Sequence, residues 1–238
     1  MKRLLRYFHP YERINRKRSH YVSSTILPNA LRSLLTQPIV DHHIKAKDRS
    51  FVVFDLETTG LNCEDDLILS IGWVVINNGV IDLASSQHLY INTDSQIKPE
   101  TAVINHIVPQ MLTDGITIHD AMAAFFAIAE DKCIVAHGCM IEENFINQYL
   151  LRAYGISPPP LIWFDTLNIE KNLNNIINKQ NQCSVTLSDT RSRYGLPEYN
   201  GHNALVDAVA TAELLLAQMK RIAPNGDTTI SSLYRLSI

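Results

Sequence analysis

Apolar residues first gather in three stretches of strand-like length. These stretches lie at residues 51–54, 67–76 and 80–91, and the first two are rich in the Val, Ile and aromatic residues that favour buried strands. Asn78 and Gly79 stand between the second and third stretches, where an Asn-Gly pair favours a tight hairpin turn. The chain is therefore expected to begin its sheet as an antiparallel meander.

The apolar period then changes from strand-like to helical. We expect helices at 121–129, 141–154, 186–194 and 204–221, and short strands at 133–136 and 161–164. The stretch at 133–136 is wholly apolar, as is typical of a strand with both faces covered. A meander followed by alternating strands and helices predicts an α/β fold in which helices flank a central mixed five-stranded sheet.

Composition divides the chain into three segments. Residues 1–49 form a basic N-terminal extension, residues 50–221 form the body, and residues 222–238 form a tail that we expect to be weakly ordered. Residues 1–50 hold eleven Lys or Arg and three acids, which gives a net charge of +8. The rest of the chain holds ten Lys or Arg and twenty-one acids, which gives a net charge of −11. An acidic body that acts on a polyanion needs metal ions or a local basic patch.

The extension contains apolar as well as basic residues. Pro10 interrupts the helical spacing of the first apolar residues, and a short helix is expected to begin with Asn29 as its cap and to end before Pro38. Three roles remain open for the extension. It is a partly ordered arm packed on the body, a nucleic-acid contact that uses the basic cluster at 16–18, or a contact with a polymerase, another protein or a membrane surface.

Overall composition limits the classes of protein that fit. Hydrophobic residues make up 46% of the 238-residue chain, which suffices for a globular core, and no apolar run reaches the roughly 18 residues of a membrane span. The N-terminus lacks the apolar region of a secretory signal. The four cysteines show neither paired nor zinc-type spacing, so we expect free thiols in a cytoplasmic protein.

Two acids follow the first apolar stretch directly. Asp55 and Glu57 are two positions apart, so their side chains point to the same face of a continuing strand. Two desolvated carboxylates side by side repel each other unless a cation lies between them. The turn at Thr59 and Gly60 then ends the strand. This pair is the first indication of a divalent-metal site.

More acids, and two histidines, lie near the starts of later helices. Glu142 and Glu143 begin the helix after His137, where sites of α/β sheets gather, although the helix dipole alone also favours acids there. Asp207 lies on an apolar helix face, where it needs a cationic partner. His202 precedes that helix and is a candidate general base, or else a capping or core residue.

These residue types suit phosphodiester hydrolysis. Two divalent ions about 3.5–4 Å apart shield the phosphate and assist the attacking and leaving oxygens. Four carboxylates offer the oxygen ligands that Mg²⁺ or Mn²⁺ prefers, and a histidine can take the proton of the attacking water. The sequence thus points to metal-dependent phosphoester chemistry.

Three segments resemble motifs of the DEDDh 3′–5′ exonucleases, the family of the proofreading epsilon subunit of bacterial DNA polymerase III. Residues 54–61 are similar to the first motif, and residues 202–208 are similar to the last, with the same spacing between histidine and acid. Residues 165–166 resemble the Asp-Thr pair that follows the family's fifth strand. The resemblance covers residues 50–221 and implies a ribonuclease-H-like fold.

The middle motif departs from the family pattern. The family has His-Asn, two residues and then Phe-Asp, whereas this chain has His137-Gly138, two residues and then Ile141-Glu142. The resemblance implies that Glu142 replaces the usual Asp, with Glu143 as the competing candidate. The implied site holds two Mg²⁺ or Mn²⁺ ions on Asp55, Glu57, Glu142 and Asp207, with His202 as the base.

The resemblance also implies a substrate. We expect hydrolysis at a nucleic-acid 3′ end, foremost that of single-stranded DNA, with release of nucleoside monophosphates. An RNA 3′-end-trimming enzyme and a non-catalytic nucleic-acid-binding module are the alternatives. The residues expected beside the terminal nucleotide, for which turn or core roles also remain open, are Thr58, Thr59, Gly60, Leu61, His106 and Ile107.

Overall fold

A mixed five-stranded sheet forms the centre of the molecule. The computed structural model describes residues 9–37, 41, 43–93, 107–177 and 183–238. The strands are β1 (Phe51–Thr58), β2 (Ile68–Asn77), β3 (Val80–Tyr90), β4 (Cys133–Ala136) and β5 (Trp163–Asp165). Their order is β3-β2-β1-β4-β5, with β2 antiparallel to β1 and β3, and β4 parallel to β1 and β5. The predicted mixed sheet is confirmed.

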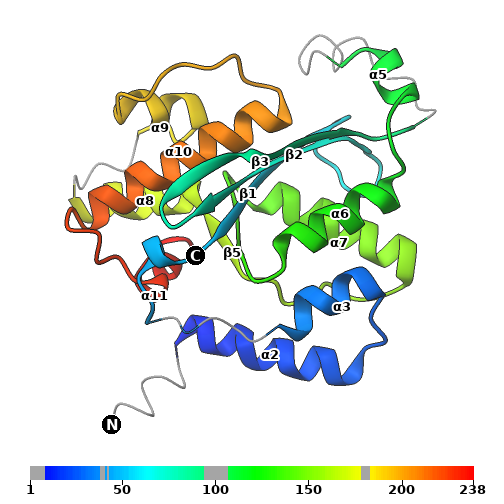
Figure 1. Cartoon of the computed structure of the whole chain (residues 1–238), viewed down its shortest axis with the longest axis horizontal. Helices are drawn as coiled ribbons and strands as arrows, with labels where there is room; N and C mark the ends of the chain where they lie inside the picture. The colour runs from blue at the N-terminus through cyan, green and yellow to red at the C-terminus, as the bar shows by residue number, and fades with distance from the viewer. Residues whose placement is uncertain (1–8, 38–40, 42, 94–106, 178–182) are drawn as a thin grey trace.

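Helices cover both faces of this sheet (Figure 1). Their bounds are α2 (Pro10–Ser24), α3 (Asn29–Thr36), α5 (Pro109–Thr113), α6 (Ile118–Ala129), α7 (Met140–Tyr154), α8 (Thr166–Ile177), α9 (Leu187–Arg193), α10 (Ala204–Ile222) and α11 (Ile230–Leu236), with a 3₁₀ turn at Ala46–Asp48. None of the described helices is long and apolar enough to cross a membrane.

The alternation of side chains along β1 divides the core into two parts. Val52 and Phe54 face the side where α3, α6 and α7 pack, whereas Phe51 and Val53 face the side where α8, α10 and α11 pack. Figure 1 shows α10 along one side of the sheet and α6 and α7 on the other. Because side chains alternate along a strand, Asp55 points to the same side as Phe51 and Val53, which is the side of α10.

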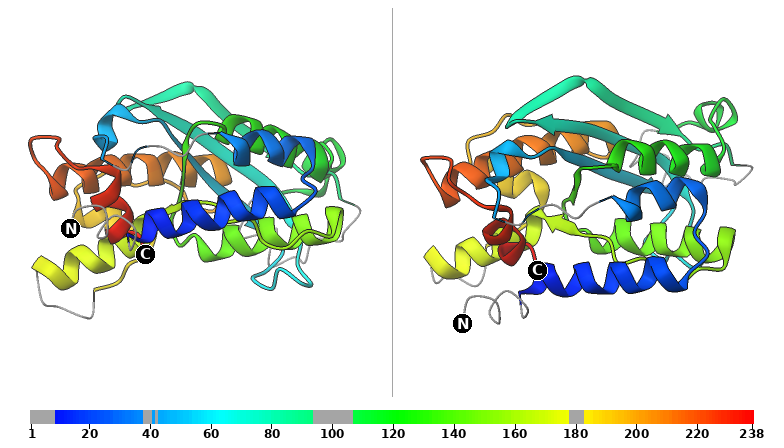
Figure 2. Two further views of the ribbon diagram at one scale, coloured as in Figure 1. Left: turned by 90° about the horizontal axis from the view of Figure 1, so that it is seen from below. Right: turned by 60° about the horizontal axis from the view of Figure 1, so that its bottom comes forward.

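The described part of the extension packs on the body through two helices, α2 and α3 (Figure 2). Pro10 occupies the first turn of α2 and so begins this helix, where the missing N–H of proline costs nothing, instead of interrupting it as predicted. Tyr11 of α2 is buried against Tyr234 of α11, with ring centroids 5.4 Å apart. The helix predicted from Asn29 is present, but Pro28 precedes it as the cap residue.

The C-terminal tail corrects the expectation of weak order. Thr229 and Ser232 form a capping box at the start of α11, in which each side chain bonds the backbone N–H of the other. Ile230 and Leu233 are fully buried, and α11 contacts α2, α8 and β5. Seven helical residues are too few for a clear apolar period, which is why the sequence pattern did not indicate this helix.

Candidate active site

Three carboxylates converge where β1 meets α10. Ligand oxygens of Asp55, Glu57 and Asp207 all lie within 4.8 Å of one another. Asp55 and Asp207 are half-buried, and Glu57 is buried. The predicted pair on one strand face and the predicted acid on the apolar helix therefore come together, at distances that one cation can bridge.

A glycine on the neighbouring strand lets α10 approach the sheet. Gly72 pairs with Asp55 across the β1–β2 ladder. A Cβ at Gly72 would lie 2.1 Å from the backbone nitrogen of Leu205 and 2.2 Å from the carbonyl carbon of Ala204. Only glycine therefore admits the first turn of α10, and this contact places Asp207 over Asp55. Sequence reasoning missed Gly72, because a glycine within a strand is equally typical of a bulge or a bend.

His202 lies directly before this helix. Its backbone is left-handed, with φ of 63°, and its N–H donates to Oδ2 of Asp207 at 2.8 Å. Asn203 caps α10 by accepting a hydrogen bond from the N–H of Val206 at 3.1 Å. The exposed His202 lines a cavity of about 550 Å³ together with Asp55 and Asp207. The histidine and the acids thus face the same space.

Glu142 is a neighbour of these three acids but does not belong to the group whose oxygens lie within 4.8 Å of one another. It is 4% exposed, and its Oε2 has no hydrogen-bond partner among the described residues. Burial, and the neighbouring charge of Asp165, raise its pKa to about 8. Its charge in turn helps to raise the pKa of Asp55. Glu143, which is half-buried, instead acts electrostatically on Tyr234. Of the two candidates, Glu142 is the one beside Asp55.

Neighbouring carboxylates oppose the ionisation of Asp55 and Glu57. Burial is the main cause of the raised pKa of Asp55, and the charges of Glu142, Asp207 and Glu57 add to it. Burial and the charge of Asp207 raise the pKa of Glu57 to about 7. Burial also raises the pKa of Asp207, partly offset by backbone N–H donors. Divalent cations would remove this conflict, so the donor set and the unpartnered Glu142 oxygen fit a metal site.

The turn before Glu142 is fixed by hydrogen bonds. Oδ1 of Asp165 accepts from the N–H groups of Gly138 and Leu167, each at 2.9 Å. The ring of His137 contacts Oγ1 of Thr166 through Nδ1, and Nε2 donates to the carbonyl of Val185, both at 2.9 Å. Burial lowers the pKa of His137, which favours a neutral ring. His137 therefore connects β4 to the start of α8, while it also lines the cavity of His202.

The loop after β1 is shaped by Asp66. Its Oδ1 accepts from Oγ1 of Thr59 at 2.9 Å, and its Oδ2 lies 2.4 Å from where a Cβ on Gly60 would stand. Oγ1 of Thr58 donates to the carbonyl of Gly60 at 2.6 Å. Leu61, at the tip, is 78% exposed. The threonines and glycine thus build the turn, and Leu61 is the side chain presented outward.

Two further predicted substrate contacts lie on the segment after the meander. His106 falls outside the described residues. Ile107 is 2% exposed and packs in a small core with Leu69 and Leu112. Of the two roles left open for Ile107, the structure therefore favours the one in the core.

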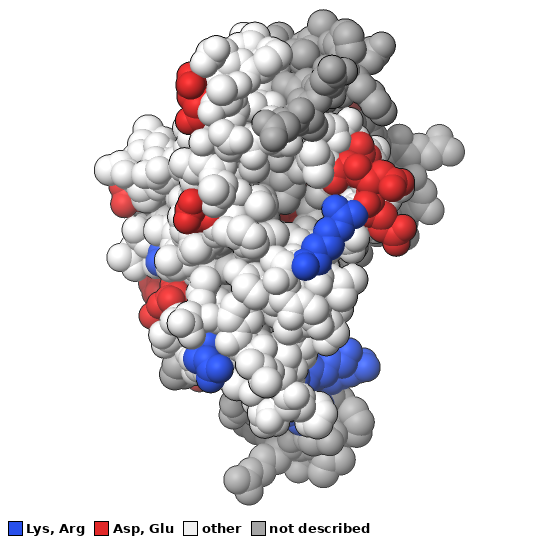
Figure 3. Space-filling view, turned by 90° about the vertical axis from the view of Figure 1, so that its right-hand side faces the viewer, with Lys and Arg blue, Asp and Glu red and all other residues white. Residues whose placement is uncertain are grey.

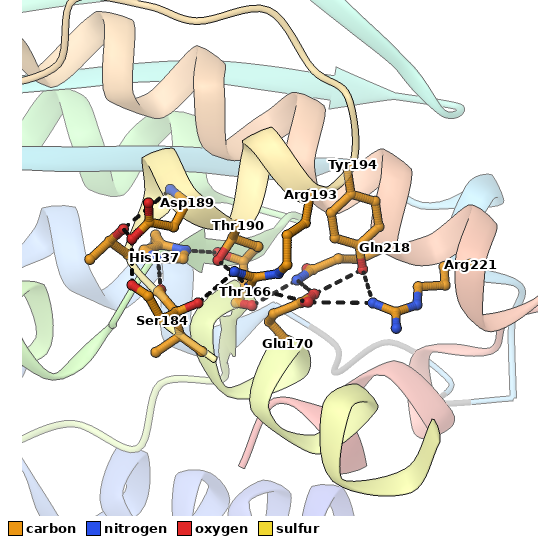
Figure 4. A network of polar contacts seen from close by, with 12 residues as sticks. His137, Thr166, Glu170, Ser184, Asp189, Thr190, Arg193, Tyr194, Gln218 and Arg221 are labelled. Atoms are coloured by element: carbon orange, nitrogen blue, oxygen red, sulfur yellow. Dashed lines mark hydrogen bonds and ion pairs between the residues drawn. The ribbon is translucent and has the colours of Figure 1, made fainter. Parts of the chain in front are cut away.

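A polar network anchors α8, α9 and α10 behind the site (Figure 4). Glu170 of α8 is fully buried and accepts from the hydroxyl of Tyr194 at 2.8 Å. Arg193 and Arg221 approach the same carboxylate at 3.4 Å each, and Nε2 of Gln218 approaches it at 3.3 Å. A buried carboxylate requires such partners. The network fixes how α9 and α10, which flank the cavity, lie relative to α8.

Comparison with known proteins identifies the family of this chain. The family model described as "Exonuclease" matches residues 52–215, most of the chain. The chain belongs to this exonuclease family. Its expected resemblance to the DEDDh exonucleases is thereby confirmed.

Relatives of this exonuclease domain include much longer proteins. This chain is 30% identical over 190 residues to a "DNA polymerase III PolC-type" of Thermotoga maritima, and the match covers 79% of this chain and 13% of the relative. The Staphylococcus epidermidis protein of the same description is 28% identical over 188 residues, covering 78% and 12%. The chain therefore spans about an eighth of the length of these relatives.

Solved structures share the fold. Escherichia coli exonuclease I in complex with a dT13 oligonucleotide aligns with a TM-score of 0.60 and 16% identity, over 74% of this chain and 42% of that chain. The nuclease domain of 3′hExo, described as a DEDDh family member bound to rAMP, aligns with a TM-score of 0.61 and 12% identity, over 76% and 96%. The ribonuclease-H-like fold is confirmed.

Proposed function

We propose that this exonuclease domain is a metal-dependent 3′–5′ exonuclease that removes nucleoside monophosphates from the 3′ end of single-stranded DNA. The convergence of three carboxylates, with the buried Glu142 beside Asp55, carries the proposal, because the raised pKa values of these acids and the unpartnered Glu142 oxygen leave the site in need of cations. DNA is favoured because the matched relatives are DNA polymerases and because exonuclease I aligns in a complex with dT13.

Asp55, Glu57, Glu142 and Asp207 would hold two Mg²⁺ or Mn²⁺ ions. When bound, such ions neutralise the phosphate and stabilise the attacking and leaving oxygens. The chain itself supplies the general base and an apolar contact for the substrate. The exposed ring of His202, in the cavity shared with Asp55 and Asp207, is positioned to accept the proton of the attacking water. Leu61 offers apolar surface to the terminal base.

The test uses a single-stranded DNA labelled at its 5′ end. Wild-type protein is expected to shorten it stepwise with Mg²⁺ or Mn²⁺ and to be inert in EDTA. Asp55→Ala removes a carboxylate that neighbours acids on both β1 and α10, and should abolish degradation. Persistent degradation by Asp55→Ala, measured alongside a mock purification from cells without the gene, would refute the assignment.

RNA 3′-end trimming is the second candidate. It is favoured by one observation, the alignment with 3′hExo bound to rAMP. Competition between DNA and RNA oligonucleotides of matched sequence separates the two, since the preferred strand will be consumed first. A chain that binds both strands in EDTA but degrades neither with metal would instead be a binding module.

The cations of α2 support a contact between the extension and nucleic acid. Arg18 is committed to structure, because its guanidinium donates to the carbonyls of Leu34, Leu35 and Gln37 at the end of α3. Arg13 and Lys17, one turn apart, are exposed. On the face drawn in Figure 3, acidic side chains gather in a patch beside a cationic side chain. A basic helix would compensate for such an acidic body.

The double variant Arg13→Glu/Lys17→Glu tests this contact. It should weaken the binding of DNA and reduce its dependence on salt concentration, while leaving turnover at saturating DNA unchanged. Unchanged DNA binding with lost binding of a polymerase subunit would assign the surface to a protein partner. Cys63, Cys133 and Cys139 are free thiols, which supports a reducing compartment such as the cytoplasm.

A further inference from the structure

The segment that carries His202 has little regular structure to hold it. Residues 194–203 connect α9 to α10, and Pro197, Glu198, Tyr199 and Asn200 are all exposed. An exposed connection of this kind is normally mobile. A general base must nevertheless stay within hydrogen-bond reach of the attacking water. Some contact must therefore restrain the segment.

Arg191 of α9 makes that contact. It is 4% exposed, and its guanidinium donates to the carbonyl of Pro197 at 2.8 Å and to the carboxylate of Glu213 at 2.7 Å. It also donates to the carbonyl of Ala210, which lies about one turn after Asp207 on α10. The ring of Tyr199 lies 4.7 Å from the guanidinium carbon. One side chain thus joins α9, α10 and the connecting segment.

The segment and α10 are linked a second time by Tyr199. Its hydroxyl donates to Oε1 of Glu213 at 2.9 Å, while Arg191 binds Oε2 of the same carboxylate. The guanidinium is therefore held by a carboxylate on one side and covers an aromatic face on the other. Tyr199 is only three residues before His202, so this restraint acts close to the base.

We propose that Arg191 is a positioning residue that holds the segment of His202 over the acidic site. This rests on the proposed function, in which His202 is the base. Arg191 also lines the cavity, but its guanidinium is engaged by Ala210, Pro197 and Glu213, so it would act through the segment and not on the substrate. Its planar fork serves two carbonyls and a carboxylate at once, which the single ammonium of a lysine cannot do.

Two variants of Arg191 distinguish geometry from charge. Arg191→Lys keeps the positive charge near Asp207 but loses the fork, whereas Arg191→Met loses both. The restraint predicts that both lower kcat at least tenfold and leave KM within twofold, because the substrate is still bound but the base is misplaced. If Arg191→Lys retained wild-type kcat while Arg191→Met did not, the effect would come from charge alone and the proposal would fail.

A third variant and a second readout guard against simple unfolding. Tyr199→Leu changes a side chain that is 44% exposed and removes both of its contacts with the restraint. Hydrogen–deuterium exchange of the amides at 198–203 should speed up at least fivefold in all three variants, in metal-free protein without substrate. Exchange in β1 should stay unchanged.

Arg193→Met is the matched control. It removes an arginine from the same helix, but Arg193 contacts Glu170, Thr190 and the carbonyl of Ser184 instead of the connecting segment. Exchange at 198–203 should match wild type. An inert wild-type enzyme would refute the proposed function alone, whereas unchanged exchange in the Arg191 variants would refute the restraint.

Discussion

Substitution of Gly72 by alanine tests how α10 is held against the sheet. The new Cβ would lie 2.1 Å from the nitrogen of Leu205, about 1.3 Å short of the 3.4 Å at which ordinary contact begins. The obstructing atoms are backbone, so they cannot rotate away. The start of α10 must therefore move by about 1 Å, and Asp207 with it. A shift of this size at a catalytic group costs on the order of 100-fold in rate.

The measurement is kcat for DNA shortening at saturating Mg²⁺, together with the free energy of unfolding. Overpacking should destabilise the fold by about 1–3 kcal/mol. Gly115→Ala is the matched control, since its Cβ would lie 2.6 Å from the carbonyl oxygen of Tyr90, away from α10. It should cost similar stability but retain kcat within threefold. If Gly72→Ala kept wild-type kcat, or if Gly115→Ala lost as much, the positioning argument would be wrong.

Three further predictions concern charged residues. Glu142→Gln should lower kcat at least 100-fold and Glu143→Gln less than threefold in the same shortening assay; the reverse order would exchange their roles. Because the folded pKa of Glu142 is raised from 4.5 to about 8, its contribution to metal-free stability is full below pH 4.5 and lost as pH rises through 8. Thermal unfolding in EDTA at pH 8.5 should therefore show Glu142→Gln to be more stable than wild type, and equal or lower stability would contradict the burial of an ionisable acid. Arg18→Met should cost about 2 kcal/mol in chemical unfolding, whereas no loss would show that the carbonyls at the end of α3 do not need it.

The local pattern of the sequence was sufficient for most of the sheet. The wholly apolar stretch at 133–136 is β4 with the predicted bounds, and the Asn-Gly turn joins β2 to β3. The strand predicted at 161–164 runs from Trp163 to Asp165 instead. Helix α8 was missed, because its Asn-rich sequence has weak helix propensity and its buried Glu170 breaks the apolar period.

The acids of the site were predictable because a carboxylate at a buried strand end or on an apolar helix face is costly without a cation beside it. Asp55, Glu57 and Asp207 required only the period of their elements. The groups that hold them in place were not predictable. Gly72 matters through a contact with Leu205, far away in sequence, and Arg191 through a carbonyl on another helix. Such long-range packing leaves no local pattern.

The central claim is that these acids and their metal ions release single nucleotides from a 3′ end. The most direct measurement uses one DNA strand with different labels on its 3′-terminal and 5′-terminal nucleotides, incubated with Mg²⁺. We predict that the 3′ label appears as a mononucleotide in the first turnover and that the 5′ label is released last. Release of the 5′ label first, internal cleavage, or equal rates in EDTA would contradict the account.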